Sequence, residues 1–148
     1  MPEQTESVEA SPTPPTPPLA DWFLEELVIL ANDSGFGFGV TLQVGGLLVS
    51  GTLASGAAYF EGVAAETAPA LEGDLAETFQ KWFGNFRDLA NRKPPDGVPR
   101  TVRFIHLRDA KFYNTTGSPI PGNRGVWWRG RISEVGGFVL GTLGESEA

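Results

Sequence analysis

A glycine pair between two alternating apolar runs occurs twice in this chain of 148 residues. In the first copy, apolar residues fill every second position of residues 36–44, and Gly45 and Gly46 separate them from another apolar run at residues 47–54. A period of two predicts half-buried strands, and glycines supply the positive φ that a two-residue turn needs. Residues 36–54 therefore predict a β-hairpin.

The second copy lies in residues 125–146, where Gly136 and Gly137 separate two apolar runs. The same reasoning predicts a second hairpin, with its turn at this glycine pair. Its first strand alternates so that Val126, Trp128 and Ile132 share the face that we expect to join the core.

The opposite face of that predicted strand carries Trp127, Arg129 and Arg131, a large aromatic residue beside two cations. We expect these three residues to bind a partner. The alternative is that another part of the chain covers the indole, with the arginine stems lying over it.

Helical patterns surround the first hairpin. Asp21 is a predicted N-cap of a helix that ends near Gly35, and Ser55 is a predicted N-cap of a short helix that ends near Glu66. The clearest helix is predicted at residues 71–92, with aromatic residues on one face, acidic residues near its start and Arg near its end. We expect this helix to cover a sheet; a ligand pocket lined by its aromatic residues is the alternative.

A further strand is predicted at residues 100–114, where the alternation changes phase near Arg108 and Asp109 and so indicates a bulge. Together the patterns predict an α+β fold: a strongly bent antiparallel sheet of about five strands, an N-terminal helix, and a helical insertion between strands two and three. This order is typical of an Sm-like or SH3-like small barrel, and an open sheet packed under the 71–92 helix is the alternative.

Charge divides the chain. Residues 1–80 contain 12 acidic side chains and neither Lys nor Arg, whereas residues 81–148 contain 11 basic and 6 acidic ones. Such a division can attract copies of the chain to one another in a salt-sensitive way, unless folding intersperses the two halves. Residues 1–18 are acidic and proline-rich, which predicts a disordered tail or spacer before a single globular domain at residues 19–146.

The residues give little sign of catalysis. The chain has no Cys and one His, His106, so thiol chemistry is excluded and a transition-metal site is not expected. We expect His106 to be a partly buried strand residue whose ring hydrogen-bonds to a neighbour, with pH sensing as the alternative. No catalytic residue, metal or cofactor is predicted, and the chain is expected to be a non-enzyme.

Residues 102–143 resemble the gas vesicle accessory protein U family. The resemblance consists of residues 104–107 (FIHL), Lys111 with Tyr113, residues 128–135 (WRGRISEV) and residues 137–141 (GFVLG), with weaker similarity at residues 40–42 and 50–52. It implies a cytoplasmic accessory protein of gas vesicles that is neither a main shell subunit nor an enzyme.

We therefore expect a protein that self-associates and binds gas vesicle proteins or their shell, aiding assembly or clustering. No membrane segment and no nucleic-acid partner are expected. The alternative function is that of a nucleic-acid-binding small barrel that uses the tryptophans and a set of four arginines: Arg103, Arg108, Arg129 and Arg131.

Overall fold

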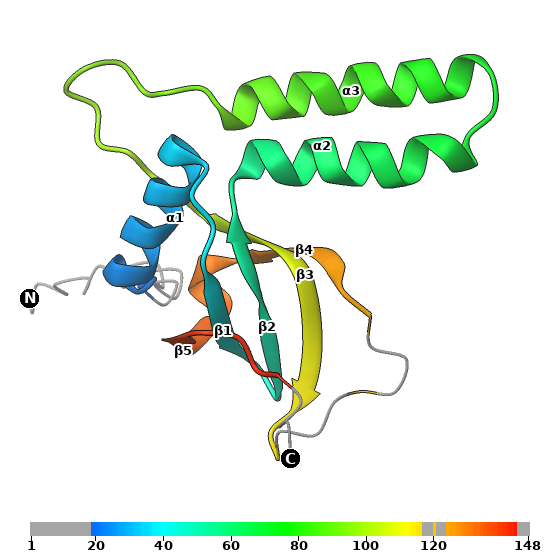
Figure 1. The fold of residues 1–148 in the computed structure, drawn as a ribbon. Helices are drawn as coiled ribbons and strands as arrows, with labels where there is room; N and C mark the ends of the chain where they lie inside the picture. The colour runs from blue at the N-terminus through cyan, green and yellow to red at the C-terminus, as the bar shows by residue number, and fades with distance from the viewer. Residues whose placement is uncertain (1–18, 117–119, 121–123, 145–148) are drawn as a thin grey trace, which may run out of the picture.

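A computed structural model describes residues 19–116, 120 and 124–144, and the predicted tail at residues 1–18 lies outside them. The fold is α+β, with a five-stranded antiparallel sheet of order β4-β3-β2-β1-β5 (Figure 1). The strands are β1 (Gly39–Val44), β2 (Leu47–Ala54), β3 (Phe104–Asn114), β4 (Val126–Arg131) and β5 (Val135–Leu140). The helices are α1 (Trp22–Ser34), α2 (Gly56–Thr67) and α3 (Asp74–Ala90), with short 3-10 turns η1 (Ala68–Ala70) and η2 (Ile132–Glu134).

Helix α1 begins and ends where the sequence predicts. The Asp21 side chain accepts a hydrogen bond of 2.8 Å from the Phe23 backbone N–H, which satisfies one of the free donors at the helix start. Gly35 ends the helix in the left-handed conformation at φ 68°.

The first predicted hairpin is also confirmed, since β1 pairs with β2 and Gly45 takes a positive φ of 58°.

The predicted second hairpin is wrong. Gly136 and Gly137 lie inside β5, and this strand pairs with β1 at the opposite edge of the sheet from β4. The chain turns earlier, at η2, where Ile132 is buried and its N–H donates to the Arg103 carbonyl at 2.8 Å. Gly137 faces Gln43 while Val135 faces Val44, so Gly136 is the extra residue of a bulge.

Strands β4 and β5 are the two edges of the sheet as described. The sheet as described is therefore not closed, and the predicted small barrel is not confirmed. The predicted irregularity in β3 is confirmed, because its pairing shifts between Leu107 and Ala110, and Asp109 adopts φ 52°. Gly51 of β2 lies against this bulge, where a methyl group would stand 2.9 Å from the Arg108 carbonyl oxygen.

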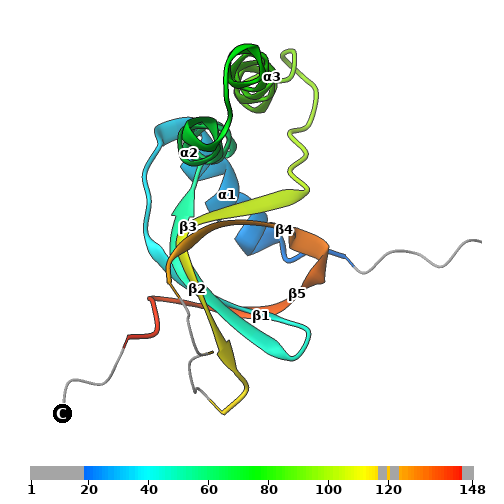
Figure 2. The same cartoon turned by 90° about the vertical axis from the view of Figure 1, so that its right-hand side faces the viewer.

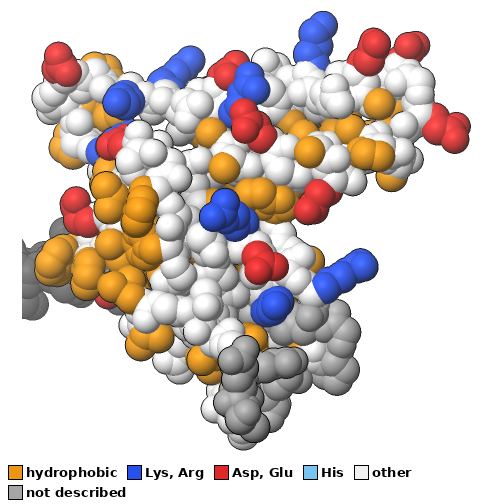
Figure 3. Space-filling view, viewed as in Figure 1, with side chains coloured by type: hydrophobic (Ala, Val, Ile, Leu, Met, Phe, Trp, Pro, Cys, Tyr) orange, Lys and Arg blue, Asp and Glu red, His pale blue; other side chains and the backbone are white. Residues whose placement is uncertain are grey.

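The predicted helical insertion between the second and third strands is confirmed. Helices α2 and α3 run side by side in both views and project beyond the sheet as a helical arm, defined here as residues 56–90 (Figures 1 and 2). Figure 3 shows acidic side chains around the free end of this arm, where α3 begins. The Ser55 hydroxyl accepts from the Ala58 N–H at 3.0 Å and caps α2, as predicted.

The expectation that the 71–92 helix covers the sheet is wrong. In the structure, α2 lies between α3 and the sheet, and no residue of α3 is buried (Figure 2). The two helices hold together through aromatic contacts: Phe60 of α2 lies 6.2 Å from Phe83 and 5.7 Å from Phe86, ring centre to ring centre. The alternative fold, an open sheet packed under this helix, is wrong in that packing for the same reason, although the sheet as described is open.

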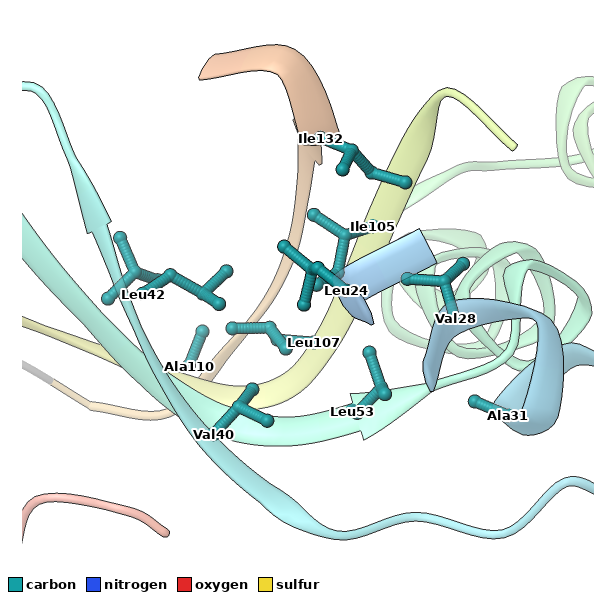
Figure 4. Packing of buried hydrophobic residues seen from close by; sticks show 11 residues of the cluster. Leu24, Val28, Ala31, Val40, Leu42, Leu53, Ile105, Leu107, Ala110 and Ile132 are labelled. Carbon is teal, nitrogen blue, oxygen red and sulfur yellow. The ribbon is translucent and has the colours of Figure 1, made fainter. Parts of the chain in front are cut away.

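The core lies between α1 and the sheet (Figure 4). Leu24 and Val28 of α1 point at Ile105 and Leu107 of β3, and all four are at most 1% exposed. Burying a side chain of this size stabilises a fold by roughly 1.5–3 kcal/mol. The core fixes α1 and β3, and it thereby fixes where the helical arm and the first residues of β3 meet.

Candidate partner-binding surface

The three residues predicted to bind a partner lie on one face of β4, but they differ in what surrounds them. Trp127 is half-buried beneath α2, where its ring meets the Tyr59 ring edge-on at 6.2 Å. The indole fits because residue 62 of α2 is glycine, and a methyl group there would overlap it. Helix α2 therefore covers part of the indole, while arginine stems lying over it are not found among the described residues, and the predicted partner contact of Trp127 stays a prediction.

Arg129 is exposed, and its guanidinium lies over the Phe104 ring at 3.8 Å from the ring centre. The same guanidinium is 5.7 Å from the centre of the Phe60 ring on α2. Cation–π attraction of this kind contributes about 0.5–1 kcal/mol at exposed sites. Arg129 is thus held between the sheet and the helical arm, with its charge still open to solvent.

Arg131 is exposed at the end of β4, opposite Phe104 of β3. Arg103 precedes Phe104 and is also exposed. Sequence reasoning did not place Arg103 and Phe104 in the predicted contact face, because their proximity to β4 depends on strand pairing between residues distant along the chain. No local pattern signals it.

These residues border two adjoining hollows that share Val102, Arg103 and Phe104. One, of about 470 Å³, lies between the helical arm and β3 and also includes Phe86, Leu89, His106 and Arg129 in its wall. The other, of about 520 Å³, lies beside the start of α1 and is completed by Ala20, Arg131, Ile132 and Ser133. We call the two together the arginine groove, after Arg103, Arg129 and Arg131. Its described lining contains no carboxylate.

His106 lies under the helical arm and is 7% exposed. Its ring centre is 4.8 Å from that of Tyr59, and its Nε2 has no hydrogen-bond partner among the described residues, so the predicted hydrogen bond of the ring to a neighbour is not found at that atom. Burial lowers the pKa of His106, the nearby positive charge of Arg129 acts in the same direction, and together they bring this pKa to about 4. The ring is therefore neutral near pH 7, and its titration falls below the physiological range that pH sensing would need.

A second candidate surface is the part of α3 that α2 leaves exposed. Its apolar residues span an arc too wide for one neighbouring helix to cover. Phe83 contacts Phe60 of α2, Phe79 stacks on Phe83, and both are half-buried. The rest form a line spaced by seven, four and three residues, which we call the outer stripe; its members, with their exposed fractions, are Leu75 (59%), Trp82 (61%), Phe86 (40%) and Leu89 (57%).

The outer stripe ends at the arginine groove, because Phe86 and Leu89 belong to both. Apolar and cationic side chains thus adjoin on one surface. A smaller apolar patch lies over α1, visible at the edge of Figure 3, and includes Trp22 (75% exposed) and Leu30 (48%).

The four arginines of the predicted nucleic-acid surface are divided in the structure. Arg103, Arg129 and Arg131 share the groove, whereas Arg108 faces Thr52 of β2 and lies near Gly37. Within the described residues, no group of three or more His, Cys, Asp or Glu side chains is arranged to hold a metal ion. Nor does any helix in this part of the chain have the length and apolar character needed to span a membrane.

Comparison with known proteins agrees with the resemblance seen in the sequence. The family described as "Gas vesicle protein GvpU-like" matches residues 21–143, which include every helix and strand of the structure. Neither a curated protein nor a solved structure matches the chain. Because the match spans most of its length, this chain belongs to the GvpU-like family of gas vesicle proteins.

Proposed function

We propose that this protein is a non-enzymatic, cytoplasmic accessory protein that binds gas vesicles or their shell components, and copies of itself, through the helical arm. Membership of the GvpU-like family supports the gas vesicle as the partner. The exposed outer stripe supports the proposal that the helical arm makes the contact. Exposed apolar residues in a contiguous line are typical of a surface that contacts another protein.

The outer stripe supports a contact of modest strength. Covering its four half-exposed side chains would contribute roughly 3–6 kcal/mol before the cost of association is subtracted. That is too little for a tight complex of two single molecules. Self-association would strengthen attachment, because several linked copies bind a surface far more tightly than one.

The cations of the arginine groove add charge to this surface. Arg129 and Arg131 stay in the proposed contact, and they favour a partner with acidic side chains. Trp127 has a different proposed role, since it supports α2 from below and so helps to hold the arm in place. The free end of the arm is acidic, so the arginines of one copy are attracted to the arm of a second copy.

The test is co-flotation, because intact gas vesicles rise in a centrifuge and carry bound protein with them. We expect the wild-type protein to float with purified vesicles and Trp82→Glu to float about tenfold less, given the apolar contact that it would lose. Trp82 is exposed, so its replacement should alter the folding free energy little.

Gln80→Glu is the matched control, because it adds the same charge two residues away, on the polar side of α3. It should float as the wild type does. Wild-type protein that stays wholly below the vesicles at both low and high salt would refute the proposal.

A nucleic-acid-binding protein is the second candidate, favoured by the three arginines around Phe104 in one groove. A gel-shift titration at low salt separates the two functions. Retarded nucleic acid, with retardation lost in Arg129→Glu, would favour this candidate over vesicle binding.

A further inference from the structure

The arginine groove contains positive charge that the described residues do not neutralise. Arg103, Arg129 and Arg131 are exposed, and the ion pairs between described residues involve only Arg87 and Arg100. With no carboxylate in its described wall, the groove is suited to an occupant that carries several negative charges.

The wall of the groove is also apolar between these charges. Val102 and Phe104 line both hollows together with the arginines, and Phe104 is 38% exposed beneath the Arg129 guanidinium. Extended proline-rich peptides bind in grooves lined by aromatic side chains, because their backbone conformation is largely set before binding. The best-matched occupant is therefore an acidic peptide that is rich in proline.

Such a peptide is present in this chain. Residues 1–18 contain three glutamates, six prolines and neither Lys nor Arg. The glutamates are Glu3, Glu6 and Glu9, and five of the prolines lie in residues 12–18. The segment thus carries negative charge at one end and prolines at the other.

The segment also joins the described chain at the right place. Ala20 is part of the wall of the hollow that contains Arg131 and Phe104, so Pro18 is two residues from the groove. Glu9 precedes Ala20 by eleven positions, a distance of up to roughly 34 Å in an extended proline-rich conformation. Glu9 can therefore reach any of the three guanidinium groups without strain in the connection.

We propose that residues 1–18 bind in the arginine groove of the same molecule. The prolines of residues 12–18 contact Phe104 and Val102, and the glutamates neutralise the arginines. Attachment in the same chain gives the peptide an effective concentration in the millimolar range, so that even a weak contact is occupied for most of the time. The segment then competes with any acidic partner for Arg129 and Arg131. This contact shares residues with the proposed vesicle-binding surface, but it does not depend on what that surface binds.

The test uses the full chain with a nitroxide spin label on Ser7→Cys, which introduces the sole cysteine of the protein. The label broadens the NMR signals of nearby amides. We expect the amide signals of residues 103, 104 and 131 to lose intensity, while those of the β1–β2 turn at Gly45 keep theirs. The loss should disappear in high salt, because exposed charges are screened within about 8–10 Å at moderate ionic strength and less far at higher salt.

Charge reversal of the glutamates in residues 1–18, or of the arginines in the groove, gives the matched variants. Glu6→Arg with Glu9→Arg should abolish the broadening, as should Arg103→Glu with Arg131→Glu. Combining all four changes should restore it, and this recovery distinguishes an electrostatic contact from damage to the fold. An absence of selective broadening in the wild type would overturn the proposal.

Mixing separates binding within one molecule from binding between two. Spin-labelled protein without ¹⁵N is mixed with ¹⁵N-labelled protein that has no spin label. Broadening in the mixture that matches the single-molecule sample would show that a second copy supplies the segment, which contradicts the proposal. No vesicle is present in these experiments, so their failure leaves the proposed function standing, and failed flotation leaves this inference standing.

Discussion

Besides Trp127, two side chains of the sheet contact the helical arm. His106 packs against Tyr59 of α2, and Arg129 lies between Phe60 of α2 and Phe104 of β3. Neither contact is a hydrogen bond or an ion pair. Packing therefore places the arm, with one hydrogen bond of 3.0 Å at its base from the Gly56 N–H to the Asn32 Oδ1 of α1, and the neutral state of His106 is part of that packing.

The buried His106 makes folding stability depend on pH. Its pKa is about 4 in the folded protein and near 6.5 when unfolded, so the unfolded chain binds the proton more readily between these values. Stability is then greatest above pH 6.5 and falls as the pH drops toward 4. We expect a loss of about 2 kcal/mol between pH 7.5 and pH 5 from this residue alone.

Urea unfolding at the two pH values measures the effect, with His106→Leu as the comparison. Leucine keeps an apolar side chain at the site and removes the titration. The wild type should lose about 2 kcal/mol more than the variant on acidification. Equal losses in both proteins would contradict the lowered pKa.

Among the elements, the docking of α2 on β4 decides where the arm lies. Gly62 lets the Trp127 indole pass beneath α2, whereas Gly84 of α3 has no neighbouring atom within 4 Å of an added methyl group. The same substitution at the two glycines should therefore have opposite effects on stability.

We expect Gly84→Ala to stabilise the protein by about 0.5–1 kcal/mol, because alanine favours the helix. Gly62→Ala gains the same preference but overpacks against the indole, which costs about 1–3 kcal/mol, so the net effect should be destabilising. In a Trp127→Ala background the overpacking is absent, and Gly62→Ala should become stabilising. Urea unfolding of the wild type, Gly62→Ala, Trp127→Ala and the double variant measures these changes in stability. If Gly62→Ala is still destabilising in the Trp127→Ala background, the contact between Gly62 and the indole is disproved.

The sequence predicted elements well where the signal was local. Asp21, Ser55 and the Gly45 turn each specify a cap or a turn through neighbouring backbone groups, and all three are confirmed. The glycine pair at residues 136 and 137 misled the prediction because burial of Ile132 makes the chain turn before it. Local glycine chemistry permits a hairpin but does not require one.

The surface was harder to predict than the fold. The β4 face was identified from alternation, but the covering of Trp127 depends on α2, which is about 65 residues away along the chain. The outer stripe was expected to be buried, because amphipathic spacing does not tell which neighbour, if any, covers a face. The width of the apolar arc on α3 was the available signal, since one helix covers only part of it.

At the scale of the whole molecule, the sheet and α1 form a packed body from which the helical arm projects (Figure 1). The outer stripe and the arginine groove meet where the arm joins this body. We therefore assign support to the core and the proposed contact with a partner to the arm. The apolar patch over α1 is the competing contact surface on the described part of the chain.

Hydrogen–deuterium exchange of the vesicle-bound protein tests this assignment most directly. Flotation isolates the bound protein, and the exchange of each segment is compared with that of the free protein. The account predicts slower exchange in α3, residues 74–90, with α1, residues 22–34, unchanged. Slower exchange confined to α1, with α3 unchanged on the vesicle, would contradict it.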